Sequence, residues 1–282
     1  MAQGDQFEIE KIVKQSGSSF YWGMKILPNK QTRAMFAVYS FCRIVDDIAD
    51  EIKDKIKREK LLKEWELSIK NLFLKQITKN SVERELLFSI KEFNLEKKDF
   101  LSIIEGMRMD SNSNIVFPSQ KKLNLYCDRV AVAVGYLSIK IFGLSKSAKN
   151  YALFLGRAFQ LTNIVRDFSE DIDRGRCYIS IKYLQKYKVK KDIKKIKNNP
   201  YLQNIFQDIL KDAETYFQKS LVESKNLDKK KIIASEIMKL FYEKIHKKMF
   251  ENYININKKI KLSIWDKVSI FFNFYIRKVH QK

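Results

Sequence analysis

The sequence predicts an all-α protein that folds as a single domain. Glycine and proline are scarce, with 8 Gly and 3 Pro among 282 residues, so little of the chain suits tight turns. Long stretches are rich in Leu, Ile, Lys, Glu and Phe, and no strand-like alternation with Asn-Gly turns interrupts them. With 45% hydrophobic residues, the chain can bury one large core or two modest ones. Because no repeat, low-complexity tract or linker divides it, we expect residues 1–282 to form one helical domain.

The excess of positive charge restricts the classes of partner. The chain has 55 Lys and Arg against 33 Asp and Glu, a formal net charge of +22. Nucleic acid, an anionic membrane surface and an anionic small substrate would each suit this charge. Much of the excess lies in runs such as "KVKKDIKKIKNN" (188–199), where we expect the lysines mainly to solvate the surface. Since no nucleic-acid motif and no interleaving of basic and aromatic residues is present, we expect no nucleic-acid partner.

The cysteines and the apolar runs indicate the compartment. Cys42, Cys127 and Cys177 are far apart and lack the spacing of a zinc site, as expected in a reducing cytosol. The start, "MAQGDQFEIEK", is polar and acidic, unlike a secretory signal. The most apolar run (130–144) is too short to span a membrane and contains Lys140. We expect a cytoplasmic protein, and peripheral contact with the inner face of the membrane stays open.

Several common catalytic arrangements are absent. His246 and His280 are the only histidines, so a Ser-His-Asp or Cys-His mechanism is nearly excluded. His246 lies in the Lys-rich run "EKIHKKMF", where we expect a solvated helix position. No glycine pattern of a nucleotide-phosphate cradle occurs. If the protein is an enzyme, carboxylates, arginines and tyrosines must carry the chemistry.

Two acidic clusters are the main candidates for that chemistry. Asp46 and Asp50, in "RIVDDIADE", are four residues apart and follow an apolar run, and Asp47 between them should point about 100° away on a helix. Like charges at this spacing repel each other, so the pattern does not help an isolated helix. Burying unpaired carboxylates would also cost free energy. Either this acidic end is solvated, or a cation lies against it.

The second cluster repeats the same spacing. In "QLTNIVRDFSEDIDRGRCY" (160–178), Asn163, Asp167 and Asp171 recur every four residues and would share one helix face. Each cluster has a nearby arginine, Arg43 and Arg166 respectively. Two such faces across a cavity would suit Mg²⁺, which takes a few carboxylates plus waters and phosphate oxygens. A neutral amide fits this interpretation better than it fits a merely solvated face. Two solvated acidic helix ends remain the alternative.

The motifs together resemble those of the squalene/phytoene synthase family. The resemblance covers residues 15 to 270 approximately and rests on "SGSSFYWGMKILP", "AVYSFCRIVDDIADE", "EGMRMD", "YCDRVAVAVG" and "QLTNIVRDFSEDIDRGRCYIS". Within the family, the first two segments are most similar to the bacterial presqualene diphosphate synthases of hopanoid biosynthesis, with phytoene synthases as near neighbours. The resemblance implies a helical bundle of the isoprenoid synthase type with a central cavity.

The resemblance also implies roles for individual residues. It assigns Mg²⁺ binding, with Mn²⁺ as a substitute, to Asp46, Asp50, Asn163, Asp167 and Asp171, and catalytic importance to these four aspartates and to Tyr126. Lys259 stands where relatives often have arginine, which would weaken bidentate phosphate binding. Residues implied to meet the diphosphate substrates are Ser19, Tyr39, Arg43, Gln160, Arg166, Tyr242 and Lys259.

The implied reaction joins two prenyl diphosphates head to head. One substrate ionises to an allylic cation, which attacks the double bond of the second, and proton loss closes a cyclopropane. Phe20, Phe36 and Phe159 are candidates to guard the cation, although core packing is the more general role of such rings. We expect two farnesyl diphosphates to give presqualene diphosphate without NADPH, for squalene and hopanoid synthesis. Condensation of geranylgeranyl diphosphate to phytoene for carotenoid synthesis is the alternative, and a downstream pathway enzyme is a conceivable partner.

The C-terminal apolar stripe and one glycine each allow two structural interpretations. In "SIWDKVSIFFNFYIRKVH" (263–280), the residues Ile264, Val268, Phe271, Phe272, Tyr275 and Val279 form an apolar stripe flanked by basic residues. This stripe would suit either an interfacial helix on an anionic membrane or a last helix packed on the bundle. Gly135, within an apolar helical pattern, would serve either close helix approach or room for a prenyl tail.

Overall fold

The structure is a computed structural model that describes residues 2–17, 20–112, 115–256 and 258–279. In this part of the chain every element of regular structure is a helix, as predicted, and the one extended pairing is an isolated parallel bridge between Val116 and Cys177. The α-helices are, in chain order, α1 (Ala2–Gln15), α2 (Phe20–Lys25), α3 (Asn29–Glu51), α4 (Lys55–Leu74), α5 (Ser81–Phe93), α6 (Lys97–Asn112), α7 (Gln120–Cys127), α8 (Ala133–Ile141), α9 (Lys149–Arg166), α10 (Phe168–Asp173), α11 (Ile181–Lys186), α12 (Leu202–Ser224), α13 (Ile233–Phe250) and α14 (Ile264–Val279). Short π and 3₁₀ turns complete them, at η1 (Asp128–Val132), η2 (Lys146–Ala148) and η3 (Ile196–Asn198).

The helix boundaries follow from local sequence signals. All three prolines stand just before a helix: Pro28 before α3, Pro118 before α7 and Pro200 before α12. Proline fixes its own backbone and lacks an N–H group, so it tends to precede or begin a helix. Several helices begin with a side chain that accepts a hydrogen bond from a free backbone N–H of the first turn. These N-cap residues are Asp54, Asn80, Ser119 and Ser180.

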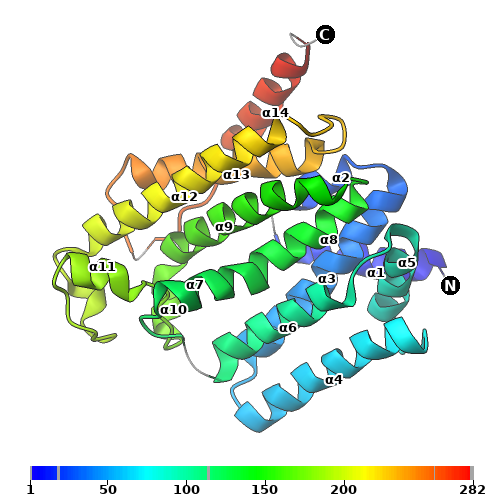
Figure 1. Ribbon diagram of the computed structural model, residues 1–282, viewed down its shortest axis with the longest axis horizontal. Helices are drawn as coiled ribbons and strands as arrows, with labels where there is room; N and C mark the ends of the chain where they lie inside the picture. The colour runs from blue at the N-terminus through cyan, green and yellow to red at the C-terminus, as the bar shows by residue number, and fades with distance from the viewer. Residues whose placement is uncertain (1, 18–19, 113–114, 257, 280–282) are drawn as a thin grey trace.

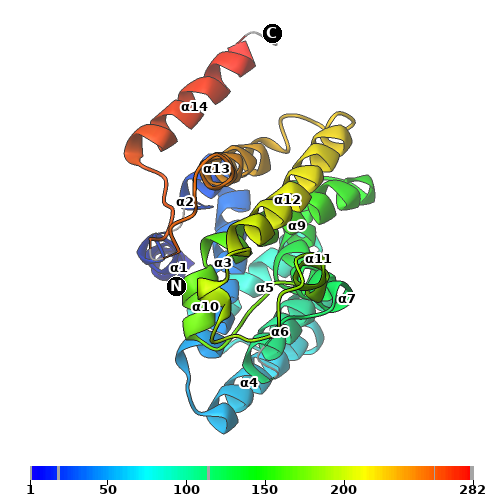
Figure 2. The same cartoon turned by 90° about the vertical axis from the view of Figure 1, so that its left-hand side faces the viewer.

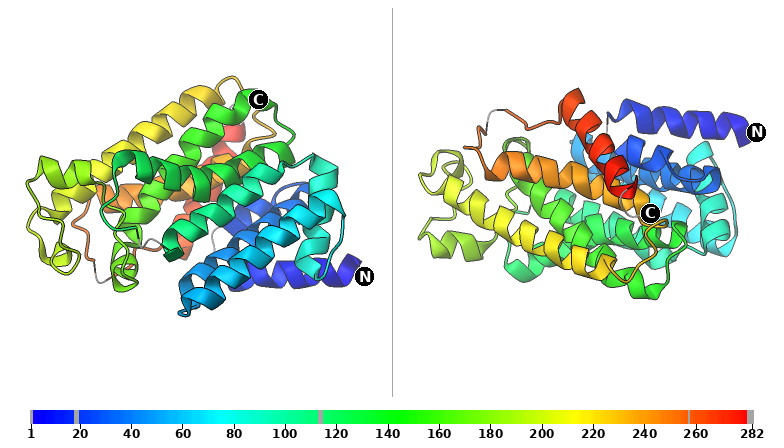
Figure 3. Two further views of the ribbon diagram at one scale, coloured as in Figure 1. Left: turned by 60° about the horizontal axis from the view of Figure 1, so that its bottom comes forward. Right: turned by 90° about the horizontal axis from the view of Figure 1, so that it is seen from above.

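Long helices run side by side through the molecule, with α9 between α12 and α8 and with α3 and α6 beyond them (Figure 1). The most extensive pairing is that of α9 with α12. Seen from above, α13 lies beside α12, and α14 crosses it (Figure 3, right). The far part of α14 projects away from the rest of the molecule, most clearly after the 90° turn (Figure 2).

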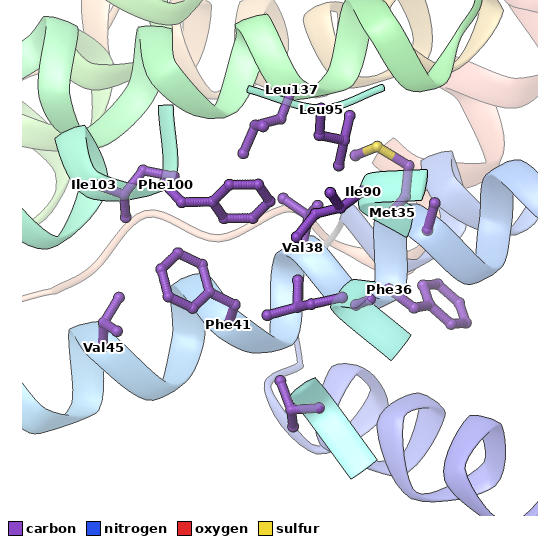
Figure 4. Packing of buried hydrophobic residues seen from close by; sticks show 14 of the residues in the cluster. Met35, Phe36, Val38, Phe41, Val45, Ile90, Leu95, Phe100, Ile103 and Leu137 are labelled. Carbon is purple, nitrogen blue, oxygen red and sulfur yellow. The ribbon is translucent and has the colours of Figure 1, made fainter. Parts of the chain in front are cut away.

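The largest apolar cluster joins α3 to its neighbours. Phe41 of α3 meets the ring of Phe100 of α6 edge-on at 5.5 Å between centroids, and both rings are fully buried (Figure 4). Val38 and Leu137 extend the same cluster toward α8. Because each fully buried side chain of this size contributes about 1.5–3 kcal/mol, this packing fixes the position of α3. The end of α3 that carries Asp46 and Asp50 is thereby held against the core.

Two glycines let helices approach η1 closely. A Cβ added at Gly156 of α9 would lie 3.1 Å from backbone atoms of Val132. A Cβ added at Gly106 of α6 would lie 2.6 Å from Cγ1 of Val130. The segment η1, which follows Tyr126, is therefore packed closely between α6 and α9.

His246 does not occupy the solvated position that its lysine-rich surroundings predict. Its side chain is buried on α13, where Nε2 donates a hydrogen bond to the carbonyl oxygen of Leu210 at 2.8 Å and the ring stacks on Phe250. The lysines around it extend from the other faces of the helix, so local composition gave the wrong prediction for this residue. In the 188–199 segment, by contrast, five of the six lysines are exposed and only Ile196 is buried.

The C-terminal helix has two apolar faces. Ile270 is buried, and Phe271 packs edge-on against Phe241 of α13. Trp265, Val268 and Phe272, on another face, are exposed. The helix thus packs on the bundle and still presents apolar side chains to solvent. None of the helices in the described ranges is long and apolar enough to cross a membrane.

Candidate active site

Both acidic clusters lie on the wall of one cavity of about 860 Å³. Asp46 and Asp50 reach it from the C-terminal half of α3. Asn163, Asp167 and Asp171 reach it from the end of α9 and from α10. The cavity therefore brings together two clusters that are more than 100 residues apart in sequence, as the sequence predicts.

The chain from α9 into α10 keeps the i,i+4 spacing although the helix changes direction at Asp167. The N–H of Asp167 donates to the carbonyl of Asn163 at 2.8 Å, and the N–H of Asp171 donates to the carbonyl of Asp167 at 3.0 Å. These two hydrogen bonds are those of a continuous α-helix. The three side chains therefore share one face, which is turned to the cavity.

Two of the carboxyl groups are held partly in their neutral form by their surroundings. Burial, and then the charge of Asp50, raise the pKa of Asp46 to about 7. Burial, and then the charge of Asp167, raise the pKa of Asp171 to about 8. The exposed surface of Asp46 lines the cavity, where the surrounding protein reduces the stabilisation that bulk water gives an ion. Clustered carboxylates with raised pKa values would be stabilised by a bound cation.

The other two aspartates are paired with basic side chains. Arg176 donates to Oδ1 of Asp50 at 2.6 Å, and Arg174 lies 3.2 Å from Oδ2 of Asp50. Arg166 holds Asp167 with two hydrogen bonds of 2.8 and 2.7 Å, and Lys259 lies 3.0 Å from the same carboxylate. Arg166 and Lys259 together hold the pKa of Asp167 below its usual value despite its burial.

The donor set fits a hard divalent cation. Oδ1 of Asn163 is buried without a hydrogen-bond partner in the described structure, which is costly unless something else satisfies this oxygen. Within the described ranges, no three Asp, Glu, His or Cys side chains converge on one point as a complete ligand set. Mg²⁺ does not require such a set, because it usually keeps waters and takes phosphate oxygens beside one or two carboxylates. Asp46, Asp50, Asn163, Asp167 and Asp171 could hold it together with a diphosphate.

The cavity wall carries acidic and basic side chains in equal number. Its described lining residues include seven acidic side chains and seven basic ones. A diphosphate alone would add excess negative charge, and a divalent cation alone would add excess positive charge. This balance favours binding of the two together.

A second, apolar cavity of about 280 Å³ lies against the first. The two share lining residues, among them Tyr39, Gln160 and Tyr242, so a charged cavity and an apolar cavity lie side by side. Gly135 lines the apolar cavity, and a Cβ there would lie 3.3 Å from Ala152, so this glycine permits a close approach of α8 to α9.

The predicted aromatic residues differ in position. Phe20 and Phe159 line the apolar cavity, and Phe159 stacks on Tyr242 with 4.1 Å between ring centroids. Phe36 instead packs in the core, where its ring stacks on that of Tyr21. Two of the three candidate rings can therefore face a bound hydrocarbon.

The remaining predicted residues also reach the charged cavity, with one exception. Ser19 lies outside the described residues. Asp47 is absent from the lining and pairs with Arg43 on its own helix, as expected for a side chain turned away from Asp46. The residues of the implied catalytic and substrate-binding sets that line the cavity, besides the proposed metal ligands, are Tyr39, Arg43, Tyr126, Gln160, Arg166, Tyr242 and Lys259.

The structure adds four lining residues to which the sequence analysis gave no role. Asp110, Arg174, Arg176 and Tyr178 all line the charged cavity. Asp110 ends the segment "EGMRMD", and the other three follow the second acidic cluster directly. These residues belong to motifs that carry the family resemblance, so the sequence could have indicated a role for them. The partner that each side chain contacts, however, depends on the tertiary fold.

An all-helical bundle in which an acid-lined charged cavity adjoins an apolar one has the architecture of a prenyltransferase of the isoprenoid synthase type. The family model for squalene/phytoene synthases matches residues 13–266. The chain therefore belongs to the squalene/phytoene synthase family, whose members act on prenyl diphosphates.

Relatives with curated names agree with this assignment. The chain is 39% identical over 247 residues to a presqualene diphosphate synthase of Zymomonas mobilis, covering 86% of this chain and 84% of that one. It is 46% identical over 171 residues to a presqualene diphosphate synthase of Rhodopseudomonas palustris, covering 60% and 61%. Identity to the 15-cis-phytoene synthase of Synechocystis is 29% over 197 residues, covering 65% and 58%.

Solved structures agree on the fold. A dehydrosqualene synthase crystallised with a ligand superposes with a TM-score of 0.85 at 24% identity, covering 98% of each chain. A squalene synthase from Alicyclobacillus acidocaldarius superposes with a TM-score of 0.79 at 23% identity, covering 89% of this chain and 94% of that one. The isoprenoid synthase fold expected from the sequence is confirmed.

Proposed function

We propose that the protein condenses two farnesyl diphosphates head to head into presqualene diphosphate, with release of one diphosphate, for squalene and hopanoid synthesis. The observation that carries this proposal is the adjacency of a charged cavity lined by both acidic clusters and an apolar cavity that shares part of its lining. A prenyl diphosphate has the same two-part character. Relatives named presqualene diphosphate synthase are 39–46% identical to this chain, and those named phytoene synthase 29–31%, which favours the C15 substrate.

The charged residues suit ionisation of the first substrate. Arg43, Arg166 and Lys259 line the cavity and can offer N–H donors to the departing diphosphate. Bound Mg²⁺ would supply positive charge that stabilises the same leaving group. Because the carboxylates and Asn163 would orient the diphosphate through the metal, no protein nucleophile is needed.

The apolar cavity suits protection of the allylic cation that remains. The rings of Phe20, Phe159 and Tyr242 lie together where the two cavities meet. Aromatic faces attract a cation, and an apolar wall excludes the water that would quench it. The second substrate can then be attacked at its C2–C3 double bond before solvent intervenes.

Product analysis tests the proposed function. The purified protein is incubated with farnesyl or geranylgeranyl diphosphate, with Mg²⁺, Mn²⁺ or EDTA, and with or without NADPH. We expect presqualene diphosphate from the C15 substrate with either metal, none with EDTA, and no change on adding NADPH. Phytoene from the C20 substrate, with little turnover of the C15 substrate, would contradict the proposal.

We also propose that α14 contacts an anionic membrane surface, to which a product with long prenyl chains would pass. The support is the exposed apolar face of this helix, which carries Ile264, Trp265, Val268 and Phe272. Lys261 and Lys267 are next to it in sequence, and the chain as a whole carries a net charge of +22. Apolar side chains flanked by lysine are typical of helices that lie in a membrane interface.

Co-sedimentation with vesicles tests this contact. We expect binding to vesicles that contain anionic lipid, a decrease as salt is raised, and a large loss in a Trp265→Ser, Phe272→Ser double variant. Val222→Ser, at an exposed apolar position on α12, is the matched control and should bind like the wild type. Equal binding of the double variant and the wild type would contradict the assignment to α14.

A further inference from the structure

A buried polar cluster at the wall of the charged cavity surrounds Tyr126, and its other members, Asp110, Tyr178 and Arg176, have no part in the proposed function so far. Asp110 lies in the last turn of α6 and lines the cavity, and the hydroxyls of Tyr126 and Tyr178 both point at its carboxylate. Tyr126 donates to Oδ2 at 3.0 Å, and Tyr178 donates to Oδ1 at 2.6 Å. Nη1 of Arg176 lies 4.0 Å from Oδ2. All four residues are more than nine-tenths buried, and all line the cavity.

The fold holds this cluster rigidly. The two tyrosine rings stack with 4.7 Å between their centroids. Backbone hydrogen bonds between Phe117 and Cys177 and between Cys177 and Ile115 tie the segment that carries Tyr178 to the segment that follows α6. The two tyrosine hydroxyls and the Asp110 carboxyl group are therefore held in fixed positions. Hydrogen bonds to a charged oxygen in buried surroundings are strong.

The hydrogen bonds within this cluster indicate which of its groups carry a proton. Two O–H donors directed at one carboxylate favour the ionised form of Asp110. Burial and the negative charge of Asp110 raise the pKa of both tyrosines well above the usual value, so both stay protonated. Burial also raises the pKa of Asp110, to about 6, although Arg176 and both tyrosines favour its charged form. Asp110 is thus charged at neutral pH and is a better proton acceptor than an ordinary aspartate.

A phenol that gives its proton to a carboxylate keeps its oxygen lone pairs for another donor. Tyr126 lines the cavity, so its oxygen can receive a proton from a bound molecule while its own proton passes to Asp110. The tyrosine is neutral before and after this exchange. No phenolate forms, which its buried position would oppose.

We propose that Asp110, acting through Tyr126, takes up the proton that is lost when the cyclopropane ring closes. This inference rests on the proposed function. The C–H bond breaks at C1 of the first substrate, the carbon that has just bonded to the second substrate. Its electron pair forms the third bond of the ring, to the cationic carbon. The proton passes to the Tyr126 oxygen as the original hydroxyl proton passes to Oδ2 of Asp110. The neutral carboxyl then returns its proton to water when the product leaves.

The relay acts after ionisation, so the two stages should separate in variants. In Asp110→Asn the acceptor is gone but the arginines and the acidic clusters remain. We expect diphosphate release within about 10-fold of the wild type. The presqualene diphosphate formed per diphosphate released should fall at least about 10-fold, replaced by allylic alcohols or C30 products without the ring. Tyr126→Phe should give the same change.

Matched variants separate this role from a structural one. Tyr178→Phe removes the other hydroxyl from the same carboxylate, so turnover should fall while the ring-containing fraction is retained. Asp99→Asn changes a buried aspartate at the other end of α6 and should leave both quantities unchanged. Thermal unfolding of each variant checks folding. If Asp110→Asn does not fold, Asp110→Glu and Tyr126→Phe carry the test, and Asp110→Glu should restore part of the ring-containing fraction.

Deuterium at C1 of farnesyl diphosphate gives a second readout that packing defects would not change. In Asp110→Glu, proton removal should be slow, so the deuterated substrate should give a lower ring-containing fraction than the undeuterated one. In the wild type the two substrates should give nearly the same fraction. A wild-type product ratio in both Asp110→Asn and Tyr126→Phe, or loss of ring closure in Tyr178→Phe alone, would overturn the proposal. If the wild type itself forms no presqualene diphosphate, the proposed function fails instead, so the two failures are distinguishable.

Discussion

Arg176 donates a hydrogen bond to Asp50 across 126 positions of sequence, with 2.6 Å between Nη2 and Oδ1. This contact joins the segment after the second acidic cluster to the helix that carries the first. Together with the pairing of Arg166 and Asp167, it gives one aspartate of each cluster a hydrogen-bonded arginine. Asp46 lies 3.7 Å from Arg43 and, like Asp171, still has a raised pKa. The two kinds of aspartate should therefore respond differently to substitution.

Asp46→Asn and Asp167→Asn should both lower turnover by about 100-fold or more, because each removes a proposed cation ligand. Their effects on the stability of the metal-free protein should have opposite signs. Asp46 is a carboxyl whose charge the fold disfavours, so asparagine should leave the free energy of unfolding equal or higher. Asp167 is held by Arg166 and Lys259, so asparagine should lower it by about 1–3 kcal/mol.

Steady-state kinetics and urea unfolding in EDTA check these two variants. Asp173→Asn is the matched control, because Asp173 belongs to α10 but does not line the cavity, and its turnover should be unchanged. Wild-type turnover in both Asp46→Asn and Asp167→Asn would refute the assignment of metal ligands. Equal stability changes in the two variants would refute the electrostatic distinction.

Lys259 should contribute to substrate binding more than to the chemical step. Its ammonium lies 3.0 Å from Asp167 and 2.8 Å from Glu170. When a cation takes Asp167, this charge becomes available to the diphosphate. We expect Lys259→Ala to raise KM for farnesyl diphosphate about 10-fold with a smaller effect on kcat. Lys259→Arg should bind at least as well as the wild type, and Lys258→Ala is the neighbouring control. A fall in kcat at unchanged KM would assign Lys259 to another step.

The sequence predicted the position of cavity-lining residues well where that position depends on local helix spacing. The i,i+4 spacing of Asn163, Asp167 and Asp171 survives the bend at Asp167 because the backbone hydrogen bonds continue through it. Asp110 could not be assigned in this way, because its partners Tyr126 and Tyr178 come from segments that only the tertiary fold brings together. The error at His246 has the same origin. Its neighbours in sequence are lysines, but its neighbours in space are carbonyl and aromatic groups of the core.

Gly156 should be required for the close approach of α9 to η1. A Cβ there would lie 3.1 Å from N and Cα of Val132, and backbone atoms do not move aside easily. We expect Gly156→Ala to lower the free energy of unfolding by about 1–3 kcal/mol. Gly4→Ala in α1 is the matched control. A Cβ at Gly4 meets no atom within 4 Å, so helix propensity should leave stability equal or raise it by up to about 1 kcal/mol. Chemical unfolding of both variants tests this, and a neutral Gly156→Ala would contradict the tight packing.

Asp99 should make the stability of the protein depend on pH in a region away from the active site. Its side chain is buried on α6, and burial together with the nearby charge of Glu96 raises its pKa to about 6. In the unfolded chain its pKa is about 3.9. Between these values the folded state keeps a proton that the unfolded state has lost, so the free energy of unfolding falls as pH rises from about 4 to 6. The full effect is at most about 3 kcal/mol and stays constant above that window.

Asp99→Asn should remove this contribution. Urea unfolding of the wild type and the variant at pH 4.5, 6 and 7.5 isolates it, because the other titrating groups are common to both proteins. We expect the variant to gain stability relative to the wild type as pH rises from 4.5 to 6, and the difference then to level off. A difference that does not change with pH would mean that the fold does not disfavour the Asp99 carboxylate.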